Sequence, residues 1–419
     1  MRDQIISDIR SLDPSELLAR IKEDAQTKED LVAPTTSLSV TTDGKLSING
    51  GIGRVAEMTD RAQQQIAQYL GIPTRYWDRM KSAAPDLLAT NANEWIGRLT
   101  EDRRMVRLMR GRVRAILSDR YDRFDNLDAV MAIHDAIKDM PEVVPVRGWY
   151  DENGMSLSLV RQDVVEAVGG LGAMDARTHN QDTHQDLASP CATARNDETG
   201  GGASTVLVGM FSRFCCNLFL WATNVRKIHL GTKIDAEAER WLSQEARSAR
   251  NRATALAMAD LVRAAFTPET FAEMMKSAGN SKRLSVDEPI TVLKQIAERE
   301  ALHEDALLQA FMAAPEPTAW GIASAVTLLA QRTAGQDQQI QMSLLGGKLL
   351  DESASLDRFA AAVSEKAPRV MTVSAGSVLP VQYLRDSQQS AAARIRSEIR
   401  TTIAAPAVVE TPILDSMLQ

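Results

Sequence analysis

The chain has 419 residues, with 48 Lys and Arg against 55 Asp and Glu, a formal net charge of −7 and 44% hydrophobic residues. This is a globular composition with enough apolar mass for a large core, in two or three domains or a single large one. No apolar run approaches the roughly 18 residues of a membrane span. Charges also interrupt the N-terminus where a signal peptide is apolar. We therefore expect a cytoplasmic protein without a membrane partner.

Residues 1–100 are expected to form a helical N-terminal part with one small hairpin. A helical lead over 1–32 precedes Asp43-Gly44, a turn pair flanked by alternating residues, as in a hairpin. Thr59 is a candidate N-cap for the next helix, and Gly71 lies where a C-cap glycine belongs.

Residues 101–234 are expected to form a central α+β sheet domain. Strands over 104–118, 142–161 and 203–220 alternate or carry long apolar runs, and we expect them to pair in one antiparallel sheet. The segment 171–202 has no periodicity and is rich in Thr, Asp, Asn, Gln and Gly, which predicts a long loop.

Residues 235–365 are rich in Ala, Leu, Glu and Arg and predict a helical domain, with breaks at Pro268, Pro289 and Pro315. A C-terminal tail follows over 366–419. The fold class is therefore α+β: an antiparallel sheet built from hairpins in the centre, flanked by a helical N-terminal part and a helix-rich C-terminal part.

Cofactor and metal motifs are weak. The three cysteines, Cys191, Cys215 and Cys216, form neither a disulfide framework nor a C-x-x-C zinc motif. The glycines at 51–53 lack the strand–helix–strand context of a dinucleotide site. His179, Asp182 and His184 could share one metal, but a solvated loop is the better interpretation of this polar segment. We expect no cofactor and no metal.

Two segments are basic in an acidic chain. Residues 98–123 hold nine arginines against four acids, and on alternating strands Arg104, Arg110, Arg112 and Arg114 could share a phosphate-binding face. Residues 199–234 contain no acid and interleave basic groups with aromatics, a pattern typical of single-strand binding. A solvated strand face above a buried aromatic core would give the same patterns, so both interpretations stay open.

Several segments resemble one protein family. SDRYDRFDN at 118–126 resembles the S-D-R-Y-x-x-x-x-N stretch of an uncharacterised family of phage- and plasmid-like proteins, defined by a domain of unknown function. In the same order, NDETGGGAS (196–204), SRFCCN (212–217), RKIHLG (226–231) and SAVTLLAQ (324–331) are similar to its later motifs. The resemblance covers roughly residues 55–335 and implies a mobile-element origin but no activity. Its polar motif positions here are Asn196, Glu198, Asn217 and His229.

The resulting hypothesis is a phage or mobile-element protein of the host cytoplasm. We expect it to bind single-stranded DNA or RNA without being an enzyme, in recombination, replication or genome protection. The expected contacts are Arg104, Arg110, Arg112, Arg114, Arg120, Arg213, Trp221, Arg226 and Lys227.

Two alternatives stay open. One is an interaction protein that binds a host defence or replication factor, and a homo-oligomer is compatible with either role. The other is an enzyme, which predicts that Glu198, Asn217 and His229 cluster in one pocket.

Overall fold

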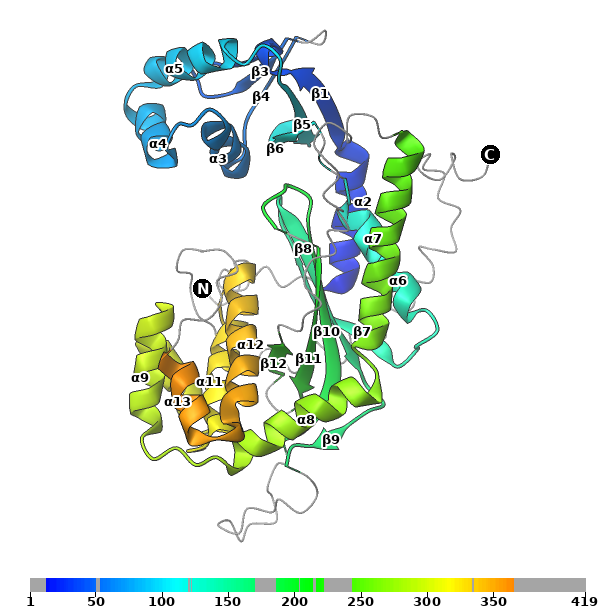
Figure 1. Ribbon diagram of the computed structural model, residues 1–419, viewed down its shortest axis with the longest axis vertical. Coiled ribbons are helices and arrows are strands. Elements are labelled where there is room, and N and C mark those ends of the chain that lie inside the picture. Colours follow the sequence, from blue (N-terminus) through cyan, green and yellow to red (C-terminus); the bar gives the residue numbers. More distant parts are fainter. Residues whose placement is uncertain are drawn as a thin grey trace.

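The computed structural model describes residues 13–49, 53–119, 121, 123–169, 186–202, 204–213, 216–221, 243–333 and 335–364. Over these residues the strands pair in antiparallel sheets, and most helices gather in regions of their own (Figure 1). The α+β prediction is confirmed.

An N-terminal lobe stands apart from the rest of the molecule at the top of Figure 1. It contains two three-stranded sheets, ordered β1-β5-β6 and β2-β3-β4, and three helices. Trp77, Ile66 and Leu88 are almost completely buried in its core. Its elements are β1 (Glu29–Pro34), the 3-10 turn η1 (Thr35–Ser37), β2 (Leu38–Val40), β3 (Leu46–Ile48), β4 (Arg54–Ala56), α3 (Asp60–Tyr69), α4 (Thr74–Ala83), α5 (Pro85–Gly97), β5 (Arg103–Met109) and β6 (Arg112–Ser118).

Local signals in this lobe act as the sequence predicts. The Thr59 side chain caps α3 by accepting from the backbone N–H of Ala62 at 3.3 Å, and Gly71 ends the helix at φ +69°. Arg110 and Gly111 both have positive φ and join β5 to β6 in a two-residue turn. Such turns match the right-handed twist of a hairpin.

A central antiparallel sheet forms the middle of the molecule, in the order β12-β11-β10-β8-β7, with β9 beside β10. One face carries Leu157, Ala192 and Val208 into the main core. In Figure 1 helices α2 (Pro14–Thr27), α6 and α7 run along this side, and they contact β7, β10 and β11. The other elements named here are β7 (Val143–Tyr150), β8 (Gly154–Arg161), β9 (Glu166–Ala167), β10 (Leu187–Asp197), β11 (Thr205–Ser212), β12 (Leu218–Trp221), α6 (Asn126–Ile137) and α7 (Gln244–Ala264).

The C-terminal helices pack against the β12 edge of this sheet. Helix α12 contacts β12, and Phe219 of β12 stacks on Trp320 of α11 with ring centroids 5.0 Å apart. Pro268 and Pro289 each open a helix in its first turn, where the missing N–H needs no partner. The helices are α8 (Pro268–Arg283), α9 (Pro289–Glu300), α10 (Glu304–Met312), α11 (Ala319–Gln331), α12 (Gln336–Asp351), η3 (Glu352–Ala354) and α13 (Leu356–Ser364).

The sheet membership differs from the sequence prediction. β5 and β6 do not join the central sheet; β5 pairs instead with β1, whose Glu29 lies opposite Leu108. β1 begins inside the segment 1–32, which was expected to be a helical lead. The sequence pattern misses it because a short strand of this kind gains its hydrogen bonds only from a partner distant in sequence.

The predicted loop 171–202 is also corrected. Residues 170–185 lie outside the described residues, but 187–197 form β10, which pairs with both β8 and β11. Ala188, Cys191, Ala192 and Ala194 are completely buried. A central strand buried on both faces and built of small residues has no polar–apolar alternation, so periodicity does not reveal it.

Candidate nucleic-acid interface

The arginines of the β5–β6 hairpin do not share one face, contrary to the expectation for Arg104, Arg110, Arg112 and Arg114. Arg112 is exposed, whereas Arg107 and Arg114 are only 0% and 1% exposed. The β10–β11 turn packs over this part of the hairpin, since Glu198 in that turn contacts both buried arginines.

Arg107 is surrounded by acceptors from three separate elements. Its Nε and Nη2 donate to the two carboxylate oxygens of Asp30 at 2.8 and 3.1 Å. Nη2 also donates to Asp125 at 2.7 Å, and Nη1 donates to the backbone oxygen of Glu198 at 2.8 Å. These bonds join β1, the start of α6 and the β10–β11 turn to β5.

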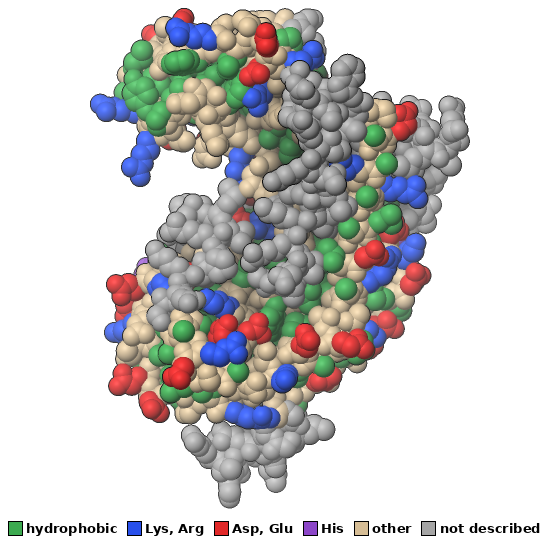
Figure 2. Space-filling model, in the orientation of Figure 1, with side chains coloured by type: hydrophobic (Ala, Val, Ile, Leu, Met, Phe, Trp, Pro, Cys, Tyr) green, Lys and Arg blue, Asp and Glu red, His purple; other side chains and the backbone are tan. Residues whose placement is uncertain are grey.

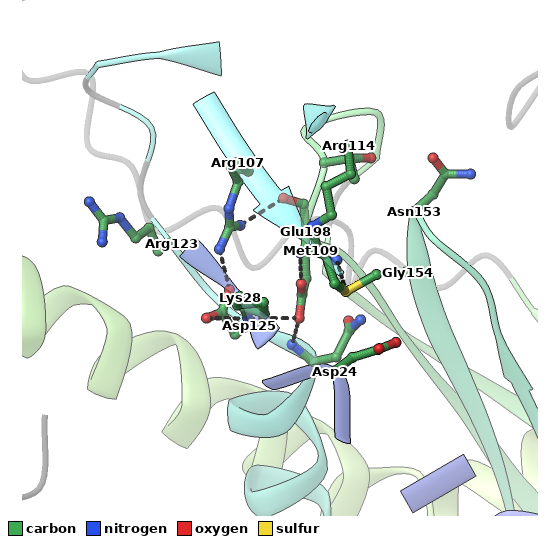
Figure 3. A network of polar contacts seen from close by, with 12 residues as sticks. Asp24, Lys28, Arg107, Met109, Arg114, Arg123, Asp125, Asn153, Gly154 and Glu198 are labelled. Carbon is green, nitrogen blue, oxygen red and sulfur yellow. Dashed lines mark hydrogen bonds and ion pairs between the residues drawn. The ribbon is translucent and has the colours of Figure 1, made fainter. Parts of the chain in front are cut away.

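Arg114 forms the second half of this cluster with Glu198 (Figure 3). One Glu198 oxygen accepts from Arg114, and the other accepts from the backbone N–H of Asn126 and lies 3.3 Å from Lys28 Nζ. Lys28 also pairs with Asp125 at 2.5 Å. We call Lys28, Asp30, Arg107, Arg114, Asp125 and Glu198 the buried charge cluster.

The basic side chains of the cluster are each paired with one or more of its acidic side chains. Burial raises the pKa of Asp125, but the nearby charges of Arg107 and Lys28 outweigh this and hold that pKa well below its ordinary value. Burial lowers the pKa of Lys28 and of Arg114, and Arg107 adds repulsion to both. Such a cluster ties the N-terminal lobe to the central sheet, and its arginines are not available to phosphate.

The outer arginines of the hairpin also have partners. Arg110 Nε lies 2.5 Å from Asp24, and Arg112 lies 3.5 Å from Glu152 and 3.8 Å from Glu57. The Arg104 guanidinium lies 3.4 Å from the centre of the Tyr69 ring. The Arg112 contacts are at the surface, so a ligand could still compete for this arginine. Arg110 is exposed, but its partner Asp24 is buried.

The second basic segment is partly described. Arg213 donates to the Ser189 hydroxyl at 2.8 Å and to the Gln162 backbone oxygen at 2.6 Å. Trp221 is 7% exposed, and its indole N–H donates to Asp351 at 2.7 Å, so it cannot stack on a base. The remaining expected residues lie outside the described residues: Arg120, Arg226, Lys227 and His229.

Two pairs of the family-like motifs meet in space. Asn196 donates to Asn126 Oδ1 at 2.9 Å, and Asn126 donates to Glu198, which joins 118–126 to 196–204. Asn217 donates to the Ser324 backbone oxygen at 3.0 Å and accepts from Gln331, which joins 212–217 to 324–331. All four motif segments therefore contribute buried hydrogen bonds that connect distant parts of the fold.

The expected pocket of Glu198 and Asn217 does not form. Glu198 precedes β11 and Asn217 follows it, and this strand of 8 residues spans about 26 Å at roughly 3.3 Å per residue. Each side chain hydrogen-bonds to a different set of partners. These two residues cannot act on one substrate atom, so the enzyme hypothesis loses the site on which it was based.

Helix α4 carries free basic groups that the sequence analysis missed. Tyr76 is 44% exposed, and Arg75 and Arg79 beside it are exposed with no acidic partner among the described residues. Trp77 and Met80 of the same helix are buried, so the helix turns a basic and aromatic face outward. The sequence RYWDR at 75–79 could have revealed this face, because residues spaced i, i+1 and i+4 lie on one side of a helix. We call Arg75, Tyr76 and Arg79 the α4 patch.

Figure 2 shows Lys and Arg side chains that project from the N-terminal lobe beside α4, over a hollow between this lobe and the C-terminal helices. Within the described part of the chain, no three His, Cys, Asp or Glu side chains are grouped closely enough to hold a metal. His179, Asp182 and His184 lie outside that part.

Comparison with known proteins gives no match to a family model, to a curated protein or to a solved structure. None of the described helices combines the length and apolar character needed to cross a membrane.

Proposed function

We propose that the protein binds single-stranded nucleic acid, without catalysis, through the α4 patch, in the recombination, replication or protection of a mobile element. The observation that carries this proposal is the exposed Tyr76 ring on the same side of α4 as two arginines that lack acidic partners in the described structure. An exposed aromatic ring gives a base a stacking surface, and flanking guanidinium groups bind the adjacent phosphates.

The α4 patch fits this role better than the β5–β6 hairpin does. Asp78 is the one acid on α4, and it forms no ion pair with either arginine in the described structure. A phosphate can therefore bind Arg75 or Arg79 without first breaking a protein contact. On the hairpin, by contrast, Arg110 and Arg112 must leave Asp24, Glu57 or Glu152.

Fluorescence anisotropy with labelled single-stranded DNA, RNA and duplex DNA tests the proposal. Replacement Tyr76→Ala is expected to weaken single-strand binding roughly 5- to 150-fold, because stacking is worth about 1–3 kcal/mol per base. The double variant R75Q/R79Q is expected to reduce the salt slope by about 1.4, since each phosphate contact on a single strand contributes about 0.7.

A matched control is R252Q/R283Q, which removes two exposed arginines of α7 and α8 that also lack acidic partners in the described structure. It is expected to bind like the wild type. If the α4 variants fold and bind with unchanged affinity, the assignment to the α4 patch is wrong. If the wild type binds no nucleic acid even at low salt, the function itself is wrong.

A second candidate function is docking of a host protein on α5. Leu87 and Trp95 of this helix are 49% and 45% exposed, and large exposed apolar side chains mark interaction sites when they lie together. A host protein that survives nuclease treatment in a pull-down, and that the variant L87S/W95S no longer retains, would favour this function over nucleic-acid binding.

We also propose that the chain is related to the phage- and plasmid-like family that its motifs resemble. The support is that segment 118–126 hydrogen-bonds to 196–204, and segment 212–217 to 324–331. Each of these bonds requires both of its segments, so a family that shares the fold is expected to share the motifs as pairs. The structure of a member of that family tests the relationship: the same two pairings between the matching segments would support it, and their absence would contradict it.

A further inference from the structure

The central sheet has a second face that the proposed function does not use. Opposite the main core, part of this face on three neighbouring strands carries charged and hydroxyl side chains, beside a hydrophobic cluster that contains Val160 and Cys191. We call this the polar sheet patch, and its members are Arg147, Trp149, Ser156, Ser158, Thr193 and Arg195.

The strand register places these residues in two rows. Arg147 of β7 lies opposite Ser158 of β8, which lies opposite Thr193 of β10. Side chains directly opposite in an antiparallel sheet point to the same face, and residues two apart share that face. The second row, Trp149, Ser156 and Arg195, therefore lies beside the first on the same face.

Arg147 differs from the other inner arginines because no acid neutralises it. Among the described residues it has no ion pair or hydrogen bond, and burial lowers its pKa, with only the thiols of Cys191 and Cys216 opposing that shift. Arg195 in the next row is paired with Asp337 of α12. Among the described residues, the row of Arg147 therefore holds one positive charge without an acidic partner.

A second donor of the patch, the Trp149 indole, also lacks an acceptor. Trp149 is 6% exposed, and its indole Nε1 has no hydrogen-bond partner in the structure. The Ser158 and Thr193 hydroxyls are 2.9 Å apart and use one hydrogen between them, so the second hydroxyl hydrogen stays available to a ligand. A cation and unsatisfied donors on one buried face match an anion with several oxygens.

We propose that the polar sheet patch binds a phosphate group, with Arg147 supplying the charge and Trp149, Ser158 and Thr193 supplying hydrogen-bond donors. A tetrahedral dianion has enough oxygens to accept from donors on β7, β8 and β10 at once. The guanidinium fork of arginine binds two phosphate oxygens together. Arg147 is partly exposed, whereas Trp149, Ser158 and Thr193 are buried, so a phosphate would enter past Arg147. This site does not depend on the α4 patch.

Thermal unfolding of the full chain tests the site, with inorganic phosphate against chloride of equal ionic strength. Phosphate at about ten times its dissociation constant is expected to raise the unfolding midpoint by roughly 2 °C. Replacement Arg147→Met is expected to abolish that rise and to leave the phosphate-free protein at least as stable, because it removes an unpaired charge. The control Arg252→Gln is expected to keep the rise.

A second variant, S158A/T193V, keeps the charge and removes the hydroxyls, and it is expected to weaken phosphate binding about tenfold. The site is overturned if the wild type shows no phosphate-specific rise, or if R147M keeps it. If R147M does not fold, unchanged phosphate affinity in S158A/T193V overturns it instead. Adenosine monophosphate and oligonucleotides with a 5′-phosphate or a 5′-hydroxyl then separate a free nucleotide from a strand end as the source of the phosphate.

Discussion

The two arginines of the buried charge cluster and Arg147 of the polar sheet patch all lie on β-strands, but their surroundings are opposite. Arg107 and Arg114 are met by Asp30, Asp125 and Glu198. Arg147 has no acid near it in the described structure. A strand arginine is therefore structural where carboxylates pair with it, and it is available to a ligand where they do not.

The largest expected effect comes from removing the acid at the centre of the cluster. Replacement Glu198→Ala leaves Arg114 and Lys28 without this partner, and breaking a buried pair costs about 3–5 kcal/mol. Urea unfolding measures the loss. The control Glu94→Ala removes an exposed partner of Arg98 and is expected to change stability by less than ~0.5 kcal/mol. Similar small losses in both variants would show that the cluster does not join the two regions.

The next effect depends on pH. The pKa of Asp125 is lower in the folded protein than in the unfolded chain, so its charged form stabilises the fold. That contribution is complete above the unfolded pKa of about 3.9 and is lost as the pH falls through the lower folded value.

Replacement Asp125→Asn is therefore expected to cost about 1–3 kcal/mol at pH 7 and progressively less below about pH 4. Asparagine also caps helices well, so the start of α6 is kept. Urea unfolding from pH 7 down to pH 3 checks this, with Asp260→Asn at an exposed pair as the control. A loss that stays constant over this range would contradict the pKa assignment.

The smallest effect is expected at the surface of the hairpin. Arg112 is half-exposed and lies 3.5 and 3.8 Å from two exposed acids, so Arg112→Gln should change stability by less than ~0.5 kcal/mol. Its nucleic-acid affinity should stay within about twofold of the wild type, in contrast to R75Q/R79Q. A loss of nucleic-acid affinity in R112Q as large as in R75Q/R79Q would show that the hairpin is part of the interface.

Sequence patterns predicted the parts of this fold that local chemistry decides. The Thr59 cap, the Gly71 helix end and the turn at Asp43-Gly44 all depend on side chains within a few residues. β1 was missed because its pairing partner, β5, is distant in the chain. β10 was missed because a strand buried on both faces and built of small residues shows no polar–apolar alternation. Of the expected site residues, Arg114 and Trp221 have side chains of a type that binds nucleic acid, but both are buried inside the protein.

The sequence by itself determined the α+β class, the hairpins, the helix ends and the presence of two basic segments. Only the tertiary structure decided which arginines meet acids, because an ion pair such as Arg114 with Glu198 joins residues 84 positions apart in the chain. The same holds for Arg147, whose lack of an acid is a property of three strands brought together. Charge can be counted along a chain, but its neutralisation is set by distances in space.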